Sequence, residues 1–502
     1  MIDTAVLRDG LDRVCARAGL GALAGEPQRL TGGAVMESWR FSAGSGAPTR
    51  ASEGAPTRAS EGAPTRASEG APTPQPPPRG EGEQFVLRRA PSLAFMQGRP
   101  YGHATEAALI EAARLAGVTA PEVVAVLEEA DGLGSGFVMR ALPGTADPKV
   151  ILGCDDPDGL LRGIARDLAR IHRLRQADVP AGVPVMDYRA AIADLRQQFM
   201  DAGGDRPIIA LGLRWLEDNV GLVSHPQPDT RPGEGRGQAG GEQIVLNHGD
   251  YRMGNLLVEG SGLTGVLDWE LAHFGDRHED LAFGCMAVWR FARYDRPALG
   301  LGSIADYIAA YEAEAGVTID PARFRFWTIY RTVWWALGCL KMAAQWRSGA
   351  DRMLERVVIS RRTSEQELDL LLLLEEDAPE AEKARPVILN DWTFQSDGEA
   401  SDIEMAVAVS EWLATLKDKL GGHDRFQLAV ARNALGMLAR SIRLAAHASD
   451  PLGAEALLAG RASLGTEGVL SELRRAAFEK LRADVPKYPA LAVARTRWKI
   501  EE

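Results

Sequence analysis

The apolar residues of this chain recur with two different periods, which divide it into a strand-rich part and a helix-rich part. After a helix expected at residues 4–18, short apolar runs bounded by glycine and proline predict five strands within residues 1–145. From residue 146 onwards, apolar residues return every three or four positions, as they do in amphipathic helices. The pattern therefore predicts an α+β protein, with a small β-rich lobe followed by a larger helical lobe at residues 146–373.

The helical period is interrupted at residues 244–283. Three short apolar runs, IVL, LLV and GVL, predict three strands there. The polar loop HGDYRMGN separates the first two strands, and Asp268 follows the third. Asp250 and Asn255 lie five positions apart in this loop, and we expect them to converge with Asp268 at the strand ends.

Two carboxylates and a carboxamide in this order are the side chains that phosphoryl transfer from a nucleoside triphosphate requires. One Asp accepts the proton of the attacking hydroxyl, and an Asn and a second Asp hold the Mg²⁺ ions that bridge the phosphates. The order is that of a kinase catalytic loop and its metal ligand. The sequence thus predicts ATP and Mg²⁺ as cofactors, Asp250 as the catalytic base, and Asn255 and Asp268 as metal ligands. The plainer alternative is that both carboxylates only solvate a loop and end a hairpin.

At these residues the sequence resembles the aminoglycoside phosphotransferase-like (choline kinase-like) family, whose signature is HGD-x-x-x-x-N followed by a strand ending in D-W/F-E. It is similar above all to the branch that includes the kinase-like domain fused to some acyl-CoA dehydrogenases, where HGDYRxGNLL and LDWE recur. The resemblance covers about residues 20–373. It implies a two-lobed protein-kinase-like fold and an ATP-dependent small-molecule kinase.

The resemblance also assigns residues to the phosphates of the nucleotide. Gly32 and Gly33 lie in LTGGAVMESW, where relatives often carry GGAS-x-E-T-W, in a loop expected to cover the phosphates through backbone N–H groups. A glycine pair alone is as often a plain hairpin turn. Arg88 stands on the third strand at the place of the kinase Lys, and its guanidinium can bind phosphate. A solvated Arg at a strand end is the alternative.

Two further nucleotide-binding residues are expected beyond this strand. Glu106 matches the helix Glu that pairs with the strand cation, with Glu111 as the runner-up, and either can be a surface acid. Thr105 is the expected N-cap of the helix. Met139 begins MRALPG, which resembles the hinge whose backbone meets the adenine.

Other residues near the HGD loop receive roles of different kinds. Arg252 is expected to steady the leaving or accepting group, or else to form a surface ion pair. His248 is expected to brace the loop, and Trp269 to pack. Glu270 is expected to help position the metal loop, and Asp280 resembles the family's Asp that caps N–H groups of the catalytic loop from the following helix.

The amino-acid composition limits which kinds of partner and compartment are expected for this chain. The 502 residues carry a formal net charge of −12, which argues against a nucleic-acid partner. The four cysteines are scattered without a C-x-x-C pair, as in a reduced intracellular protein. No signal peptide or membrane span is evident, so a cytoplasmic protein is expected. A zinc site is the alternative interpretation of His273, Asp276, His278 and Glu279, whose spacing matches no standard site.

Two segments lie outside the kinase-like pattern. GAPTRASE repeats three times from residue 46 to 69, in an insert at about 43–82 that we expect to be disordered, because it cannot bury a core. After a linker at 374–400, amphipathic helices predict a helical accessory domain at 401–502. It resembles, in HDRFQLAVARNAL and DVPKYPAL, a domain of unknown function found beside such phosphotransferases. We expect this accessory domain to mediate oligomerisation or to dock a partner enzyme.

The function expected from these patterns is transfer of the γ-phosphate of ATP to a hydroxyl of a small molecule. Relatives act on aminoglycosides, choline, homoserine, sugars and hydroxyacyl-CoA compounds, so the acceptor stays open. The first alternative is a nucleotide-binding pseudokinase that serves as a scaffold, favoured by Arg88 and by the altered glycine loop. The second alternative is a metal-dependent phosphoesterase. Such an enzyme would need an upstream Asp-x-His ligand pair, which this sequence lacks.

Overall fold

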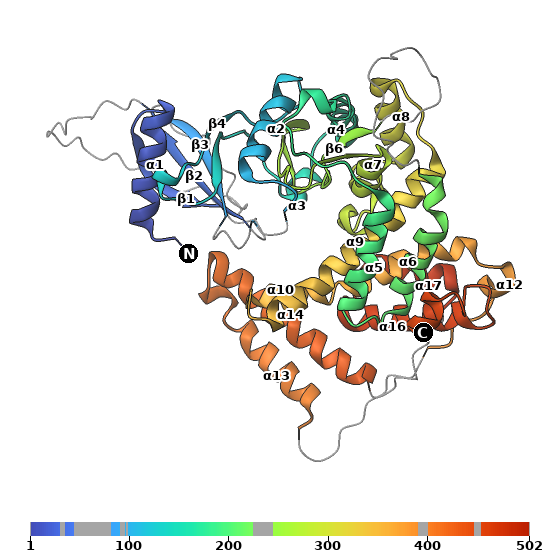
Figure 1. Cartoon of the computed structure of the whole chain (residues 1–502). Coiled ribbons are helices and arrows are strands. Elements are labelled where there is room, and N and C mark those ends of the chain that lie inside the picture. The colour runs from blue at the N-terminus through green and yellow to red at the C-terminus, as the bar shows by residue number, and fades with distance from the viewer. Residues whose placement is uncertain are drawn as a thin grey trace, which may run out of the picture. The chain divides into compact units, whose positions relative to one another are not determined.

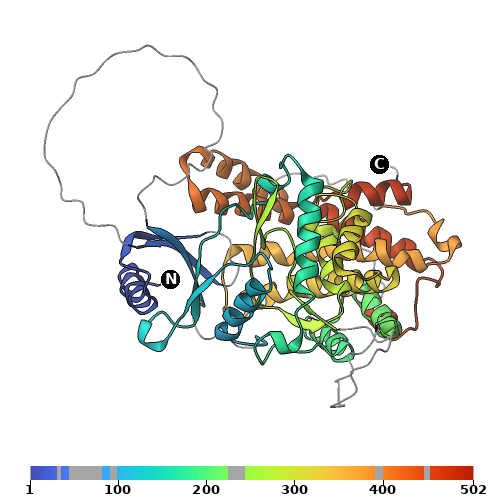
Figure 2. The same cartoon turned by 90° about the horizontal axis from the view of Figure 1, so that it is seen from above.

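The computed structural model describes residues 2–30, 36–44, 82–90, 96, 99–223, 244–389, 400–445 and 453–500. Contacts between residues divide the chain into two compact units (Figures 1 and 2). The first contains Met1–Gly144, Gln176–Val183 and Thr264–Glu270, and the second contains the remainder. Gly32, Gly33 and the GAPTRASE copies lie outside the described residues.

The first unit is built on an antiparallel sheet with the strand order β1-β2-β3-β5-β4. Buried and less buried residues alternate along its central strands, as expected of a sheet with one face on a core. Phe41 and Phe85 face each other across two strands, with ring centroids 5.6 Å apart. The strands are β1 (Leu23–Arg29), β2 (Glu37–Ala43), β3 (Glu83–Arg89), β4 (Val123–Val126) and β5 (Gly136–Arg140).

Two helices complete this unit. The first, α1 (Thr4–Ala18), begins at Asp3, whose carboxylate accepts the N–H groups of Ala5 and Val6, and ends at Gly19 in the left-handed region. Its residues Leu7, Leu11, Val14 and Cys15 pack on the sheet aromatics in one hydrophobic cluster. The second, α2 (His103–Leu115), carries Glu106 in its first turn.

The second unit is mainly helical. Its short strands β6 (Val245–Asn247) and β9 (His273–Gly275) pair with each other, and β7 (Leu256–Glu259) pairs with β8 (Gly262–Val266). The helices are α3 (Pro148–Ile151), α4 (Pro157–Ile171), α5 (Tyr188–Asp201), α6 (Pro207–Asn219), α7 (His278–Cys285), α8 (Ile304–Ala315), α9 (Pro321–Arg347), α10 (Leu354–Ser360), α11 (Thr363–Leu374), α12 (Glu380–Lys383), α13 (Asp402–Ala414), α14 (Gly422–Ala445), α15 (Ala454–Leu458), α16 (Val469–Asp484) and α17 (Ala490–Trp498).

One large hydrophobic cluster holds most of this unit together. It joins α5, α6, α9 and α11 to the C-terminal helices α15, α16 and α17. Helix α9 contributes Phe326, Trp327, Ile329 and Val333, none of them exposed. Helices α13 and α14 share a separate, smaller cluster. The C-terminal helices α15–α17 therefore pack into the same core as the helical lobe. The division into the domains expected from the sequence stays a prediction.

The α+β prediction is confirmed, with the sheet in the first unit and most helices in the second. The helix expected at 4–18 begins and ends as predicted. The predicted N-cap Thr105 is wrong. The helix begins two residues earlier after Gly102, because glycine can adopt the extended cap conformation without a capping side chain. Among the described helices, none is long and apolar enough to cross a lipid bilayer.

Candidate active site

A buried carboxylate fixes the loop that follows β6. Asp280 on α7 is 0% exposed and accepts the backbone N–H groups of His248 at 2.6 Å and Gly249 at 2.9 Å. The Nε2 of His172 lies 3.3 Å from the same carboxylate. Burial would raise the pKa of Asp280, but the hydrogen bonds from His172 and from the backbone of His248 outweigh it and lower the pKa to about 2. The predicted capping role of Asp280 is confirmed.

Gly249 has to be glycine in this arrangement. Its φ is +81°, and a Cβ atom there would lie 2.3 Å from the carbonyl oxygen of Leu271. Its carbonyl accepts a hydrogen bond of 2.9 Å from Arg331, which also pairs with Glu279 at 2.7 Å. The backbone of the loop is therefore held at both its N–H and its C=O groups, immediately before Asp250.

The structure brings Asp250, Arg252 and Asn255 together. The amide nitrogen of Asn255 donates to the Asp250 carboxylate at 2.6 Å and to its backbone carbonyl at 3.0 Å. The Arg252 guanidinium donates to the same carboxylate at 2.8 Å. The ring nitrogen of His248 accepts the N–H of Asp250 at 3.3 Å, as expected of a bracing residue. Because the nitrogen of Asn255 is committed to Asp250, its oxygen is the atom that it can offer to a cation.

Arg252, which donates to Asp250, also packs against the ring of Trp289. The guanidinium carbon of Arg252 lies 4.3 Å from the Trp289 ring centroid, within cation–π range. Trp289 follows α7 in a 3₁₀ turn at Ala287–Arg290 and is only 7% exposed. Helix α7 ends at Cys285, and an extended Met286 separates it from this turn. No sequence signal had singled out Trp289.

In the first unit, Arg88 and Glu106 meet two further charged residues around Asp268. The Nε of Arg88 lies 3.5 Å from Glu106, and its terminal nitrogen pairs with Asp268 and, at 2.8 Å, with Glu270. Arg99 pairs with Glu270 and lies 3.8 Å from Glu106. Glu111, the runner-up for the pairing, binds Arg114 instead. We name Arg88, Arg99, Glu106, Asp268 and Glu270 the acidic cluster.

The acidic cluster favours an additional cation. Its two guanidiniums face three carboxyl groups, so the carboxyl groups outnumber the cations. Burial raises the pKa of Glu106 to about 7, against the opposing effect of Arg88. Burial and the neighbouring Asp268 also raise the pKa of Glu270. A divalent cation at Asp268 would relieve this repulsion, and Mg²⁺ prefers carboxylate and amide oxygens. The residues present therefore fit the metal predicted from the sequence.

Asp268 has an unusual backbone. Its φ is +68°, in the left-handed region that few residues other than glycine adopt. The next residue, Trp269, is fully buried and is fixed by hydrogen bonds of its indole to Val266 and of its carbonyl to Tyr101. Trp269 is thus the packing residue that was predicted.

The other predicted residues make different contacts. Met139 is half-buried on β5, opposite Val86 and Val123. The residues considered for zinc are held in ion pairs of their own: His273 with Glu279, and His278 with Asp276. No group of three or more metal-binding side chains of His, Cys, Asp or Glu is found in the described part of the chain.

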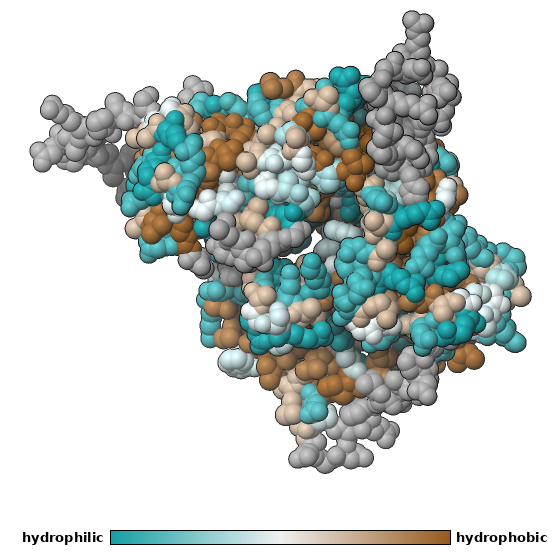
Figure 3. All heavy atoms as spheres, viewed as in Figure 1, coloured by the Kyte–Doolittle hydropathy of each residue, from teal (hydrophilic) through white to brown (hydrophobic). Residues whose placement is uncertain are grey.

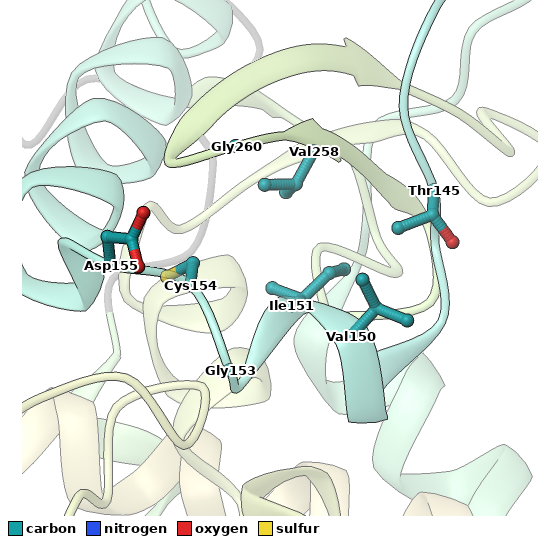
Figure 4. A pocket seen from close by; sticks show the side chains of 8 residues that line it. All are labelled: Thr145, Val150, Ile151, Gly153, Cys154, Asp155, Val258 and Gly260. Atoms are coloured by element: carbon teal, nitrogen blue, oxygen red, sulfur yellow. The ribbon is translucent and has the colours of Figure 1, made fainter. Parts of the chain in front are cut away.

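A small cavity lies in the second unit between β7 and α3 (Figure 4). Its volume is about 240 Å³, and Val258 and Ile151 face it with the carboxylate of Asp155 and the thiol of Cys154. None of the predicted site residues lines it, so we assign it no part in phosphoryl transfer.

Known proteins share this fold and sequence pattern. Residues 79–327 match the model of the phosphotransferase enzyme family. Acyl-CoA dehydrogenase family member 10 of Mus musculus is 26% identical over 255 residues, which are 47% of this chain and 22% of that protein. The chain thus spans about a fifth of that curated relative. A solved structure from Ralstonia eutropha JMP134, provisionally named an aminoglycoside phosphotransferase, has a TM-score of 0.51 at 18% identity, covering 73% of this chain and 98% of that one.

Residues 79–327 are similar to the phosphotransferase enzyme family, and the fold is shared with the solved structure. The resemblance read from HGDYRMGN and LDWE is therefore confirmed.

Proposed function

We propose that this protein transfers the γ-phosphate of ATP to a hydroxyl group of a small molecule. The observation that carries the proposal is the Asp250 carboxylate, held by Asn255 in a loop that Asp280 braces. A carboxylate fixed in this way orients an incoming hydroxyl and accepts its proton as the phosphorus–oxygen bond forms.

The remaining roles follow from the neighbouring side chains. Asn255 and Asp268 would hold Mg²⁺, which neutralises charge on the phosphates when bound. Arg88, oriented by Glu106, would contact phosphate oxygens, with Gly32 and Gly33 covering the phosphates. Met139 would lie at the adenine. Arg252, fixed between Asp250 and Trp289, would contact the transferred group.

The acceptor class is the open part of this proposal. The curated relative is named an acyl-CoA dehydrogenase family member, and the solved neighbour carries an aminoglycoside phosphotransferase name. Hydroxyacyl-CoA compounds and aminoglycosides are therefore the first acceptors to supply, followed by choline, homoserine and sugars.

Asp250→Asn is the decisive variant. We expect a loss of turnover of roughly 10²–10⁴-fold, the usual effect of a positioned base, with Mg-ATP binding retained. Phosphate transfer to each acceptor and Mg-ATP affinity would be measured in parallel. Asp9→Asn, an exposed Asp on α1, is the matched control and should leave both unchanged. Full turnover of Asp250→Asn would contradict the assignment.

The scaffold alternative rests on one observation, the engagement of the proposed metal ligand Asp268 by Arg88. In a pseudokinase this pair would persist when nucleotide is added. Wild-type protein that binds Mg-ATP but transfers phosphate to no acceptor in the panel would favour the scaffold.

A further inference from the structure

Helix α13 has a polar face between two apolar ones. Its inner apolar face packs on α14, where Ile403 and Ala406 are buried with Ala439. The helix begins at Ser401, which forms a capping box with Glu404. α13 lies at the rim of its unit, on the outer side of α14 (Figure 1).

The outer apolar face carries Met405, Ala408, Val409 and Trp412, which we name the outer stripe. Their positions, i, i+3, i+4 and i+7, place them on one side of a helix. Met405 is 53% exposed, Val409 47% and Trp412 62%. Apolar side chains gather over α13 and α14 at the lower edge of Figure 3. Single exposed apolar residues are ordinary, but a contiguous stripe with a Trp marks an interaction surface.

The outer stripe is symmetric about its own midpoint, because large residues lie at its ends and smaller ones in the middle. The two ends carry opposite net charge. Asp402 and Glu404 lie at the start of α13, and the 3₁₀ turn that follows it carries Lys417 and Lys419 with Asp418 between them, all exposed. In an antiparallel pair of α13 helices, Met405 of each copy would lie opposite Trp412 of the other, and the small Ala408 residues would lie near the centre. The acidic start of each helix would lie beside the basic turn of the other copy.

We propose that the chain forms a twofold-symmetric homodimer through antiparallel packing of the outer stripes. Met405 then packs on the partner's Trp412, and Ala408 lets the two helices approach closely near the twofold axis. Asp402 faces the partner's Lys417. Because the surface is self-complementary, the contact closes after two copies instead of growing into a filament.

The charges of α13 distinguish this partner from a lipid surface. Between Asp402 and Ala414 the helix carries three carboxylates and no cation. Anionic lipid headgroups repel such a helix, and peripheral helices normally present Lys and Arg on their polar face. The same charges favour a partner whose basic end lies beside its own acidic end, and a second copy provides that.

The oligomeric state of the full chain tests the proposal. Sedimentation velocity from about 1 to 100 µM should show a concentration-dependent dimer, with a Kd in the micromolar range expected of a small interface. Trp412→Glu should weaken association by roughly thirtyfold or more, as for an aromatic anchor of an interface. Leu115→Glu, at a leucine 73% exposed on α2, is the matched control and should leave the dimer intact.

A charge exchange keeps the test informative if Trp412→Glu misfolds. Lys417→Glu with Lys419→Glu should weaken the dimer at low salt, and added Asp402→Lys should restore part of it. Wild-type protein that stays monomeric at every concentration overturns the proposal, as does a Trp412→Glu protein that remains a folded dimer. Binding to neutral phosphatidylcholine vesicles, lost in Trp412→Glu, would overturn it in favour of a lipid surface.

Discussion

Asp268 is the residue where backbone conformation and proposed chemistry meet. Its left-handed φ of +68° is a conformation that Asp tolerates better than most residues, because its short side chain can bond locally. Its carboxylate meets Arg88 while Glu270 lies beside the same guanidinium. A strained residue at the centre of a charged cluster is typical of a functional site.

Two substitutions separate the strain at Asp268 from its charge. We expect Asp268→Asn and Asp268→Ala to lose most of the Mg-ATP-dependent stabilisation, which for the wild type at 100-fold over Kd is about 2.7 kcal/mol. Asp268→Ala should also lose about 1–2 kcal/mol without nucleotide relative to Asp268→Asn, because Ala is strained at this φ. Urea unfolding with and without Mg-ATP measures both. Wild-type-like stabilisation of Asp268→Asn would contradict its role as a metal ligand.

At the scale of elements, the catalytic loop depends on α7. The loop has few apolar residues of its own, so its shape comes from Asp280 at the N–H groups and from Arg331 on α9 at the carbonyl of Gly249. Two helices, α7 and α9, thus fix one short loop. Rigid support of this kind is what places a catalytic carboxylate within the narrow range that phosphoryl transfer requires.

Asp280→Asn should loosen the loop without touching the acceptor. The amide replaces one acceptor oxygen by a donor that faces a backbone N–H, which costs about 1–3 kcal/mol for a buried unsatisfied group. We expect faster hydrogen exchange at the amides of His248 and Gly249, and lower turnover with little change in Mg-ATP affinity. Asp295→Asn, in an exposed ion pair with Arg293, is the control and should change little. Unchanged exchange at the two amides would refute the bracing role.

At the scale of the whole molecule, buried polar contacts join the C-terminal helices to α11 and the turn that follows it. Glu375 pairs with Arg474 at 2.8 Å and accepts the indole N–H of Trp498 at 2.9 Å. Asp369 on α11 accepts the hydroxyl of Tyr488, which lies between α16 and α17. With the shared apolar core, these contacts make α15–α17 a structural part of the helical unit.

Asp369 makes this junction sensitive to pH. Burial raises its pKa from 3.8 to about 7. Between pH 4 and 7 the unfolded chain releases a proton that the folded chain retains, so this group lowers the stability of the folded state as pH rises. Asp369→Asn removes the titration. The variant should gain stability relative to wild type as pH rises from 4 to 7, by at most about 1.4 kcal/mol per pH unit, and the difference should level off above pH 7. Urea unfolding across that range measures it, and parallel curves for the two proteins would contradict the shift.

Local sequence patterns determined several features correctly. The spacing of Leu7, Leu11 and Val14 fixed the extent of α1, and the caps Asp3 and Gly19 agree with its limits. The order HGD-x-x-x-x-N identified the family, because the loop must carry an Asp and an Asn at a set distance and a glycine with positive φ. The choice of Glu106 over Glu111 was open in the sequence, and the helix orientation decided it through contact with Arg88.

The sequence by itself therefore determined the α+β class, the similarity to the phosphotransferase family and the spacing of residues in the HGD loop, because these depend on spacing along the chain. Only the tertiary structure decided which distant charges meet. Arg99 and Glu270 join Arg88 and Asp268 from segments far apart, and Trp289 covers Arg252. It also placed α15–α17 in the core of the helical lobe. Such contacts depend on three-dimensional packing of apolar faces, and a one-dimensional period carries no information about which faces will be brought together.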